Sequence, residues 1–340
     1  MADSNHDPSG KRPFRLSRRN LIVGTGGAAV IGGATAFFAD RFLQPADVFI
    51  AKASDYHVDI ASIVRHGFAE LGITRRQIAG KSILLKPNLV EPATEAPHIN
   101  THPVFIHGVA TAFLSMGARE IIVAEGPGHC RDTYLVLDES GMSAVLRDSK
   151  MSFVDLNHDD VDVVANHVGK TSLKELFLPQ TLRRADWIVS LPKMKTHHWV
   201  GATLSMKNFF GVLPGICYGW PKNVLHREGI DQSIVDIVGT VKPHLAIVDG
   251  IVAMEGDGPV MGDPKIMQTV VMGTNLPAVD ATCCRLMKLD PGYLAYLSMA
   301  SRVLGPIAEN RIVQRGETIA SMAQLFRLVD DPMMAKFRPV

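Results

Sequence analysis

From residue 46 onward, short runs of apolar residues alternate with longer segments whose apolar residues recur at helical spacing. The short runs predict buried strands, because strands of a sheet that is covered on both faces are continuously apolar. These runs lie at residues 47–51, 82–88, 120–128, 153–157, 186–193, 245–250 and 268–275. Such strands, alternating with helices, predict an α/β fold with a mostly parallel sheet and helices on both faces.

The longer segments predict helices at residues 58–72, 102–117, 132–148, 231–241, 276–288 and 291–304. Gly72 is a typical residue after a helix end, and Thr101 and Pro103 indicate an N-cap and a first turn. Residues 163–182 lack a clear helical period and predict a small β excursion. We expect one α/β domain over residues 46–340, preceded by a separate N-terminal segment, residues 1–45.

That N-terminal segment contains Arg18 and Arg19, followed by a weakly hydrophobic stretch rich in glycine and alanine with no charge before Asp40. The pattern resembles a twin-arginine export signal. So many glycines make a poor soluble helix, which argues against a buried helix here. Residues 34–36 offer a small-residue cleavage site, whereas an uncleaved segment of about 19 apolar residues is long enough to anchor the chain in a bilayer. The resemblance implies the twin-arginine export machinery as a partner and a periplasmic or extracytoplasmic location.

Composition narrows the choice of function. The chain is 46% hydrophobic and 20% charged, with a net charge of +1. Bulk charge therefore gives no argument for binding nucleic acid or an anionic membrane, and charge-based chemistry must come from local clusters.

The four cysteines are Cys130, Cys217, Cys283 and Cys284, and none forms a C-x-x-C pair. A zinc or iron–sulfur site built from cysteines is therefore not expected. A disulfide between Cys130 and Cys217 is compatible with an oxidising compartment. Cys283 and Cys284 are expected to be buried thiols.

Polar residues follow the predicted strands at the point where each strand ends. Because the carboxyl ends of parallel strands meet at one edge of a sheet, and ligands bind in the crevice there, these residues predict a binding site. The alternative is that strand ends are simply where polar loops begin. The residues placed along this rim are Lys86, Asn88, Glu125, Lys193, Lys195, Asp249 and Asn275.

The block from Leu191 to Gly215 combines lysines, histidines and aromatic residues. In an extended strand, Lys193 and Lys195 point the same way and form a cationic pair that needs an anion. Residues 201–210 have helical spacing, which places Thr203 and Lys207 on one face with Asn208 beside it. Alternatively, the lysines are solvated and the histidines pack against Trp199. The predicted substrate-binding residues are Lys86, Asn88, Lys193, Lys195, Thr203, Lys207 and Asn208.

Two residues are candidates for acid–base catalysis. His197 titrates in the range that suits proton transfer, and Glu125 ends a buried strand at the same rim. Residues 249–264 interleave acids with glycines, and acids on a bent loop hold hard cations such as Mg²⁺. We expect such a site at Asp249, Glu255 and Asp257, the alternative being an ordinary acidic turn. No nucleotide-binding or serine-nucleophile motif occurs.

Six stretches occur in a recognisable order: "LLKPNLV", "THP", "IIVAEGPG", "LPKMKTHHWVGATLSMKNFFGVLPG", "VDGIVAMEGDGP" and "AVDATCCRLM". Together they resemble the domain-of-unknown-function family 362 over roughly residues 48–300, and the K-x-K-T-H…K-N-x-x-G block is the most specific part. Many members of that family carry a ferredoxin-type cysteine run. This chain has none, so an iron–sulfur cluster is not expected. The resemblance supplies no reaction.

The sequence therefore predicts an exported enzyme that acts on an anionic small molecule, a phosphate or a carboxylate, with a divalent metal such as Mg²⁺ assisting hydrolysis or transfer. A periplasmic solute- or cofactor-binding protein without catalysis is the alternative. A redox protein, whose ligands would have to be histidine and methionine, is a third hypothesis.

Overall fold

The computed structural model of the 340-residue chain describes residues 45–129, 132–149 and 151–338. Contacts divide the chain into residues 1–44 and residues 45–340, and all features below belong to the second unit. The predicted export signal lies outside the described residues, so export stays a prediction. Within the described ranges, the structure contains no helix with the length and apolarity needed to cross a bilayer.

The strands are β1 (Ala46–Lys52), β2 (Ser82–Pro87), β3 (Glu120–Glu125), β4 (Ser152–Asp155), β5 (Val161–Ala165), β6 (Glu175–Pro179), β7 (Trp187–Leu191), β8 (Lys193–His197), β9 (Gly201–Thr203), β10 (Leu245–Glu255), β11 (Asp263–Gly273) and β12 (Ile312–Gly316). The main sheet runs in the order β12-β1-β11-β10-β7-β2-β3-β4, with β8 paired to β10 and β9 to β8. β11 pairs antiparallel with β1 and β10, and β9 with β8. The other pairs of this sheet are parallel, as predicted.

The α-helices are α2 (Ile60–Glu70), α3 (Arg75–Ile78), α4 (Pro103–Ser115), α5 (Thr133–Glu139), α6 (Met142–Asp148), α7 (Gln180–Arg184), α8 (Gly215–Tyr218), α9 (Asn223–Arg227), α10 (Ile230–Val241), α11 (Leu276–Leu286), α12 (Ala295–Ala300), α13 (Ile319–Met322) and α14 (Pro332–Ala335). Three 3₁₀ helices are η1 (Lys207–Val212), η2 (Pro291–Tyr293) and η3 (Glu309–Arg311).

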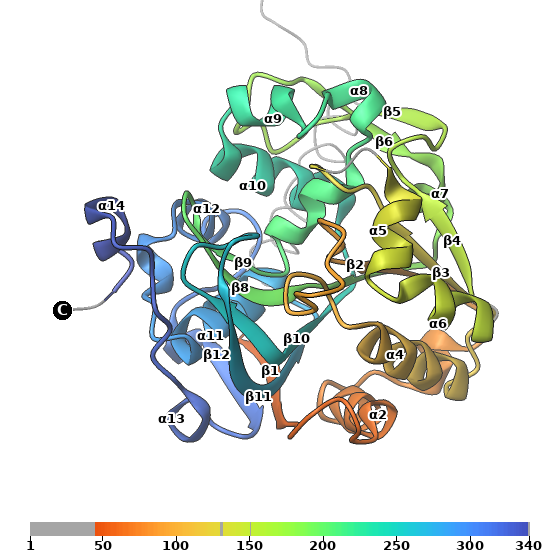
Figure 1. The fold of residues 1–340 in the computed structure, drawn as a ribbon, viewed down its shortest axis with the longest axis horizontal. Coiled ribbons are helices and arrows are strands. Elements are labelled where there is room, and N and C mark those ends of the chain that lie inside the picture. The colour runs from red at the N-terminus through yellow and green to blue at the C-terminus, as the bar shows by residue number, and fades with distance from the viewer. Residues whose placement is uncertain (1–44, 130–131, 150, 339–340) are drawn as a thin grey trace, which may run out of the picture. The chain divides into compact units, whose positions relative to one another are not determined.

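Two apolar cores lie on opposite faces of the sheet, because successive strand residues point to opposite sides. Leu84 of β2 packs into the core formed with α10, α11 and α12. Its neighbours Ile83 and Leu85 pack into the core formed with α2, α4, α5 and α6. Figure 1 shows α2, α4 and α6 together on one side of the molecule, away from α10 and α12. The α/β architecture with helices on both faces is therefore confirmed.

Several helices differ from the prediction in where they begin or in how far they extend. His102, not Thr101, is the N-cap of α4, because its ring nitrogen accepts the Val104 N–H. The predicted helix at 132–148 is two helices, interrupted at Gly141 with φ of 74°. The predicted helix at 291–304 is reduced to η2 and the short α12. The β excursion expected at 163–182 is confirmed as the hairpin of β5 and β6.

Two corrections bear directly on the site. The segment predicted as a helix at 201–210 begins as β9, which forms a hairpin with β8, and becomes helical only from Lys207. The glycine-bent acidic loop predicted at 249–264 is largely the antiparallel pair β10 and β11. In both segments, pairing with a neighbouring strand overrode the local pattern, because a ladder of backbone hydrogen bonds is available there.

The described cysteines follow part of the prediction. Cys283 and Cys284 are buried in α11, as expected. Cys217 is exposed, and Cys130 lies outside the described residues, so the disulfide between them stays a prediction.

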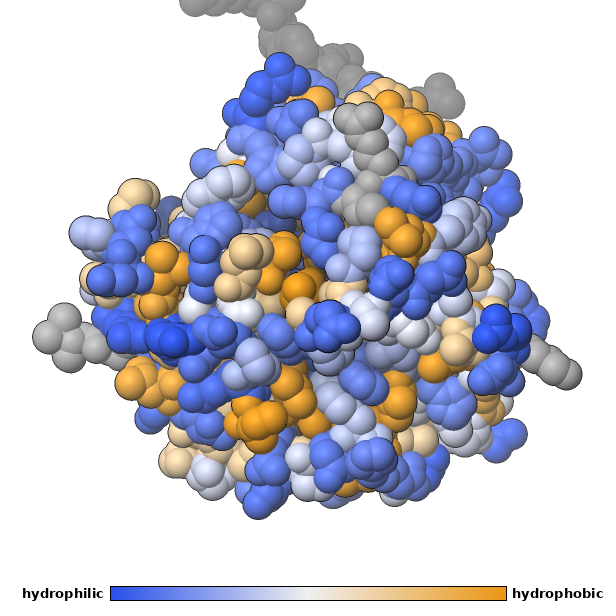
Figure 2. Space-filling view, viewed as in Figure 1, coloured by the Kyte–Doolittle hydropathy of each residue, from blue (hydrophilic) through white to orange (hydrophobic). Residues whose placement is uncertain are grey.

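Figure 2 shows one face of the molecule, on which small hydrophobic patches are scattered among hydrophilic residues.

Candidate functional site

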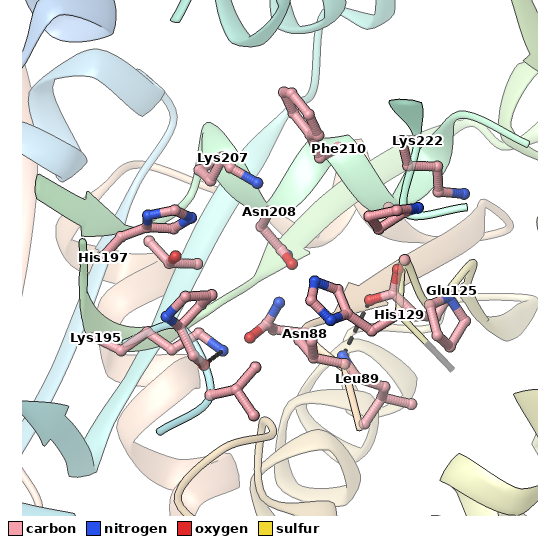
Figure 3. A pocket seen from close by; sticks show the side chains of 18 of the residues that line it. Asn88, Leu89, Glu125, His129, Lys195, His197, Lys207, Asn208, Phe210 and Lys222 are labelled. Carbon is pink, nitrogen blue, oxygen red and sulfur yellow. Dashed lines mark hydrogen bonds between the residues drawn. The ribbon is translucent and has the colours of Figure 1, made fainter. Parts of the chain in front are cut away.

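A cavity of about 510 Å³ opens at the carboxyl ends of β2, β3 and β8. The loops that follow β2 and β3 form one wall, and the β8–β9 hairpin with η1 forms another. Residues 221, 222 and 226, around the start of α9, form the third wall, and residues 257 and 259–261, between β10 and β11, form a fourth. Figure 3 shows side chains from the first three walls arranged around one space. The cavity therefore lies at the rim that the strand ends predicted.

Lys86 and Glu125 form a buried ion pair in one wall. Lys86 Nζ donates to Glu125 Oε2 at 2.5 Å, to Asn208 Oδ1 at 3.1 Å and to the Pro87 carbonyl at 2.7 Å. An ammonium has three N–H donors, so all of them are used within the protein. Glu125 also accepts the backbone N–H groups of Leu89 and Gly126. This pair is saturated and neutral, and it stiffens the wall.

Asn208 belongs to the same saturated network. Its Nδ2 donates to the Lys86 carbonyl at 2.9 Å and to Ser190 Oγ at 3.1 Å. Gly211, one turn later in η1, packs so closely that a Cβ atom there would collide with Glu125 Oε1. The K-N-x-x-G part of the sequence block therefore has a packing explanation. The asparagine ties η1 to β2, and the glycine lets η1 lie against the ion pair.

Lys193 forms a second buried ion pair, away from the cavity lining. Its Nζ donates to Asp249 Oδ2 at 2.6 Å, to Tyr56 Oη at 3.0 Å and to the Val252 carbonyl at 3.2 Å. Asp249 also accepts the Tyr56 hydroxyl and the His102 N–H. The anion expected for Lys193 is therefore the protein's own Asp249, and neither residue lines the cavity.

Lys195, two residues along β8, has a different environment. Its Nζ donates to the carbonyls of Ile99 and Pro259, both at 3.0 Å, and pairs with no carboxylate among the described residues. Burial, with the neighbouring Lys193 and Lys207, lowers the pKa of Lys195 well below its usual range. Lys195 lies opposite Thr203 in the β8–β9 pair, so both side chains share one face. One N–H position of Lys195 remains for a ligand.

Lys207 lies at the start of η1 and is partly buried in the cavity wall. Its Nζ is 3.9 Å from the Phe210 ring centroid, and no acceptor for it occurs within the described residues. Burial and the nearby Lys86 lower its pKa to about 8. Asp280 of α11 accepts the N–H groups of Ser205 and Met206 and so fixes the turn that carries Lys207.

Lys222 is a site residue that the sequence did not indicate. Its Nζ donates to Asn157 Oδ1 at 2.5 Å and to the Leu213 carbonyl, and burial lowers its pKa to about 7. Lys222 also caps α9 in the left-handed conformation, with φ of 69°. Like Lys195, it keeps one open position on nitrogen and makes no ion pair among the described groups.

His197 lines the cavity with its ring almost fully buried. The Trp199 N–H donates to Nδ1 at 3.1 Å, so the proton of the neutral ring lies on Nε2. Burial, followed by the nearby Lys207, lowers the pKa of His197 well below its usual range. The ring is therefore neutral at pH 7, and it supplies an N–H donor rather than a positive charge.

The three acids predicted as one Mg²⁺ site are not brought together. Asp249 and Glu255 are both on β10, and six residues of extended strand span about 20 Å, too far to ligate one ion. Glu255 contacts Lys265 at 3.4 Å and accepts the Arg327 N–H, while Asp257 contacts His198 at 3.1 Å. Within the described part of the chain, no group of three or more His, Cys, Asp or Glu side chains is placed to hold a metal.

The cavity thus collects part of the predicted set. Its walls include Lys86, Asn88, Glu125, Lys195, His197, Thr203, Lys207, Asn208 and Asp257, whereas Lys193, Asp249 and Glu255 lie outside its lining. Lys222 and His226 were missed because they follow no predicted strand. Asn157, which accepts a hydrogen bond from Lys222, is the last residue of the predicted strand at 153–157 and lies just after β4. The rule that polar residues at strand ends mark the site would have identified it.

Residues 83–285, more than half of the chain, match the family model described as "Domain of unknown function (DUF362)". A "Thylakoid-associated protein" of Synechocystis sp. (strain ATCC 27184 / PCC 6803 / Kazusa) is 26% identical over 234 residues, which cover 67% of this chain and 70% of that protein.

Two solved structures are similar at lower identity. The lactate racemase apoprotein from Thermoanaerobacterium thermosaccharolyticum matches with a TM-score of 0.39 and 14% identity over 63% of this chain. A protein from Thermotoga maritima matches with a TM-score of 0.37 and 11% identity over 68% of this chain. The chain spans 52% of the first protein and 59% of the second.

Proposed function

This chain belongs to the DUF362 family, and we propose that it is an enzyme acting on a small anionic molecule, a carboxylate or a phosphate, bound between Lys195, Lys207 and Lys222. The observation that carries the proposal is the state of the lysine donors. Lys86 and Lys193 use all three N–H groups and each pairs with a carboxylate. The three proposed ligand-binding lysines have open positions and no carboxylate partner within the described residues.

An anion supplies what these three lysines lack. Moving a protonated amine out of water is costly unless an anion compensates its charge. A buried lysine without a counter-ion therefore loses its proton more easily. The lowered pKa values of Lys195, Lys207 and Lys222 follow from that cause. A bound carboxylate or phosphate compensates the charge and accepts the open N–H groups. His197 adds a neutral donor through Nε2.

The geometry also supports a proton-transfer role for Lys222. A neutral amine has two N–H groups, which match the two acceptors Asn157 Oδ1 and the Leu213 carbonyl, and its lone pair then occupies the third position. With a pKa of about 7, Lys222 can take up a proton when the anion binds at neutral pH and can then return it to the substrate. Glu125, predicted as catalytic, is held in its ion pair with Lys86 and is assigned a structural role.

Anion titration of the full chain tests this proposal. We expect inorganic phosphate or a small carboxylate such as propionate to bind, measured by calorimetry. Lys207→Met should weaken binding by roughly 10-fold to 100-fold, because a charge-assisted hydrogen bond contributes about 1.5–3 kcal/mol. Its fold should persist, since no described acceptor loses a donor.

Two further variants complete this experiment. Lys81→Met removes a surface lysine that pairs with Asp186 and should leave affinity unchanged. Lys222→Met should keep the fold, because Asn157 Oδ1 still accepts the Gly215 N–H, while abolishing turnover of any substrate found in a phosphatase and esterase panel. Equal affinity of wild type and Lys207→Met for every anion would show the proposal to be wrong. Anion binding without any turnover favours a solute-binding protein.

We further propose that the chain works outside the cytoplasm, delivered by the signal around Arg18 and Arg19. The thylakoid association named for the Synechocystis relative is compatible with that location. Cell fractionation of the full-length chain checks it. Replacing both arginines with lysine should retain the protein in the cytoplasm, and an unchanged distribution would count against twin-arginine export.

A further inference from the structure

The cavity contains two buried polar atoms without a partner. Asn88 and Thr203 are exposed by only 8% and 4%, and within the described residues neither Asn88 Oδ1 nor Thr203 Oγ1 makes a hydrogen bond. Both residues line the cavity. More than about 90% of buried polar groups in proteins are hydrogen-bonded, and an unmade bond costs about 1–3 kcal/mol. Such atoms in a cavity wall indicate a ligand group that completes them.

The backbone around Asn88 is held in place. Its N–H donates to Thr101 Oγ1 at 2.9 Å, and its carbonyl accepts the Thr101 N–H at 2.8 Å. Thr101 Oγ1 in turn donates to the Leu191 carbonyl at 2.6 Å, which ties the end of β2 to the end of β7. Asn208 provides the contrast, because both of its side-chain atoms are paired within the protein. Asn88 therefore presents its side chain from a fixed position.

Asn88 Oδ1 requires a donor, which an anionic oxygen cannot provide. A carboxylate or a fully ionised phosphate only accepts hydrogen bonds, and its oxygens repel the amide oxygen. Lys195, Lys207 and the His197 Nε2–H supply donors to the anionic group. Thr203 lies directly opposite Lys195 in the β8–β9 pair, so its hydroxyl is beside the anion-binding position. Figure 3 shows Asn88 and Lys195 among the side chains that line the same space.

We infer that the ligand is a hydroxylated anion, in which a hydroxyl group lies one or two carbons from the carboxylate or phosphate. The hydroxyl donates to Asn88 Oδ1 and hydrogen-bonds Thr203 Oγ1, while the anionic group binds the lysines. This inference rests on the proposed anion pocket and adds the second recognition element. It makes the site discriminate against the matching anion without a hydroxyl, because that anion has no donor for the buried Asn88 Oδ1.

Calorimetry with two matched ligand pairs tests the inference. Glycerate is compared with propionate in the carboxylate arm, and glycerol phosphate with propyl phosphate in the phosphate arm. We expect the hydroxylated member to bind at least about 10-fold more tightly in one arm, from one or two completed hydrogen bonds. The arm that shows this preference identifies the anionic group.

Variants locate the preference. Asn88→Leu and Thr203→Val should each reduce the affinity ratio of the hydroxylated ligand to its matched analogue toward one. Thr133→Val is the matched control, because Thr133 Oγ1 is also buried and unpartnered among the described residues but lies outside the cavity lining. It should leave the ratio unchanged. Circular dichroism and thermal unfolding establish that each variant is folded, and Thr203→Val keeps the test decisive if Asn88→Leu does not fold.

The outcomes separate the two proposals. Equal affinity of the hydroxylated and deoxygenated ligands in both arms, with binding retained, overturns this inference and leaves the anion pocket standing. An unchanged ratio in both Asn88→Leu and Thr203→Val also overturns it. Absence of binding in every arm with the wild-type chain overturns the anion pocket and this inference together.

Discussion

The region around Lys193 and the region around Lys195 lie two residues apart on β8, yet they differ in how charge is compensated. Lys193 is saturated by Asp249, Tyr56 and a carbonyl. Among the described residues, Lys195 donates only to neutral carbonyl oxygens. β8 pairs with β10 at Asp249↔Lys193 and at Met254↔Lys195, so the facing strand offers an acid to one lysine and a thioether to the other. Charge compensation from the facing strand, rather than burial, therefore separates the saturated Lys193 from Lys195, which we propose as a ligand-binding lysine.

The same contrast divides the cavity walls. Lys86, Glu125 and Asn208 form a closed network whose donors and acceptors are matched. Asn88 Oδ1 and Lys207 Nζ, which line the same cavity, have no hydrogen-bond partner in the part of the chain that the structure describes. A saturated network holds a precise shape, whereas unmatched buried groups acquire partners only from a ligand. The network of matched groups therefore holds the cavity wall in shape and positions the residues that have unmatched atoms.

The largest expected effect comes from breaking the saturated region. Asp249→Ala leaves the Lys193 ammonium buried without its counter-ion, and loss of one partner of a buried ion pair costs about 3–5 kcal/mol. Chemical denaturation should show that loss in the free energy of unfolding. Lys195→Met should cost less, because it removes no counter-ion and leaves only two carbonyls without a donor. If Lys195→Met destabilises the fold as much as Asp249→Ala, the proposed difference between the two lysines is wrong.

A smaller effect is expected from pH in the open region. Burial lowers the pKa of Lys222 to about 7 and that of Lys207 to about 8. The anion binds the protonated amines and raises their pKa values, so affinity is greatest below about pH 7. It should fall as pH rises through 7 to 9, by up to about tenfold per pH unit for each proton taken up on binding.

Calorimetry across that pH range measures the dependence. Repeating it in two buffers of different ionisation enthalpy counts the protons taken up with the anion. Lys207→Met should remove the part of the dependence centred near pH 8 and leave the part due to Lys222. An affinity that stays constant from pH 6 to 9 contradicts the assignment of these two lysines to the anion.

Much of the fold followed from local pattern. The apolar runs located strands such as 82–88 and 245–250, and continuous apolarity indicated burial on both faces. The sequence predicted Lys86, Asn88, Glu125 and Lys195 along one rim, and all four line the same cavity. The helix expected at 201–210 failed because helical spacing in a short segment does not reveal that β8 will offer it a hydrogen-bonding edge.

The sequence by itself determined the α/β class, the strand-end rim and the block that carries the cavity lysines Lys195 and Lys207, because these depend on periodicity and on the direction of parallel strands. Only the tertiary structure decided which charges are neutralised. Lys193 contacts the carboxylate of Asp249, which is 56 residues away in the sequence. Lys222 contacts the uncharged amide of Asn157, which is 65 residues away. The sequence does not show how many of the three N–H groups of a lysine are hydrogen-bonded. That number depends on the acceptors that folding brings near the ammonium group.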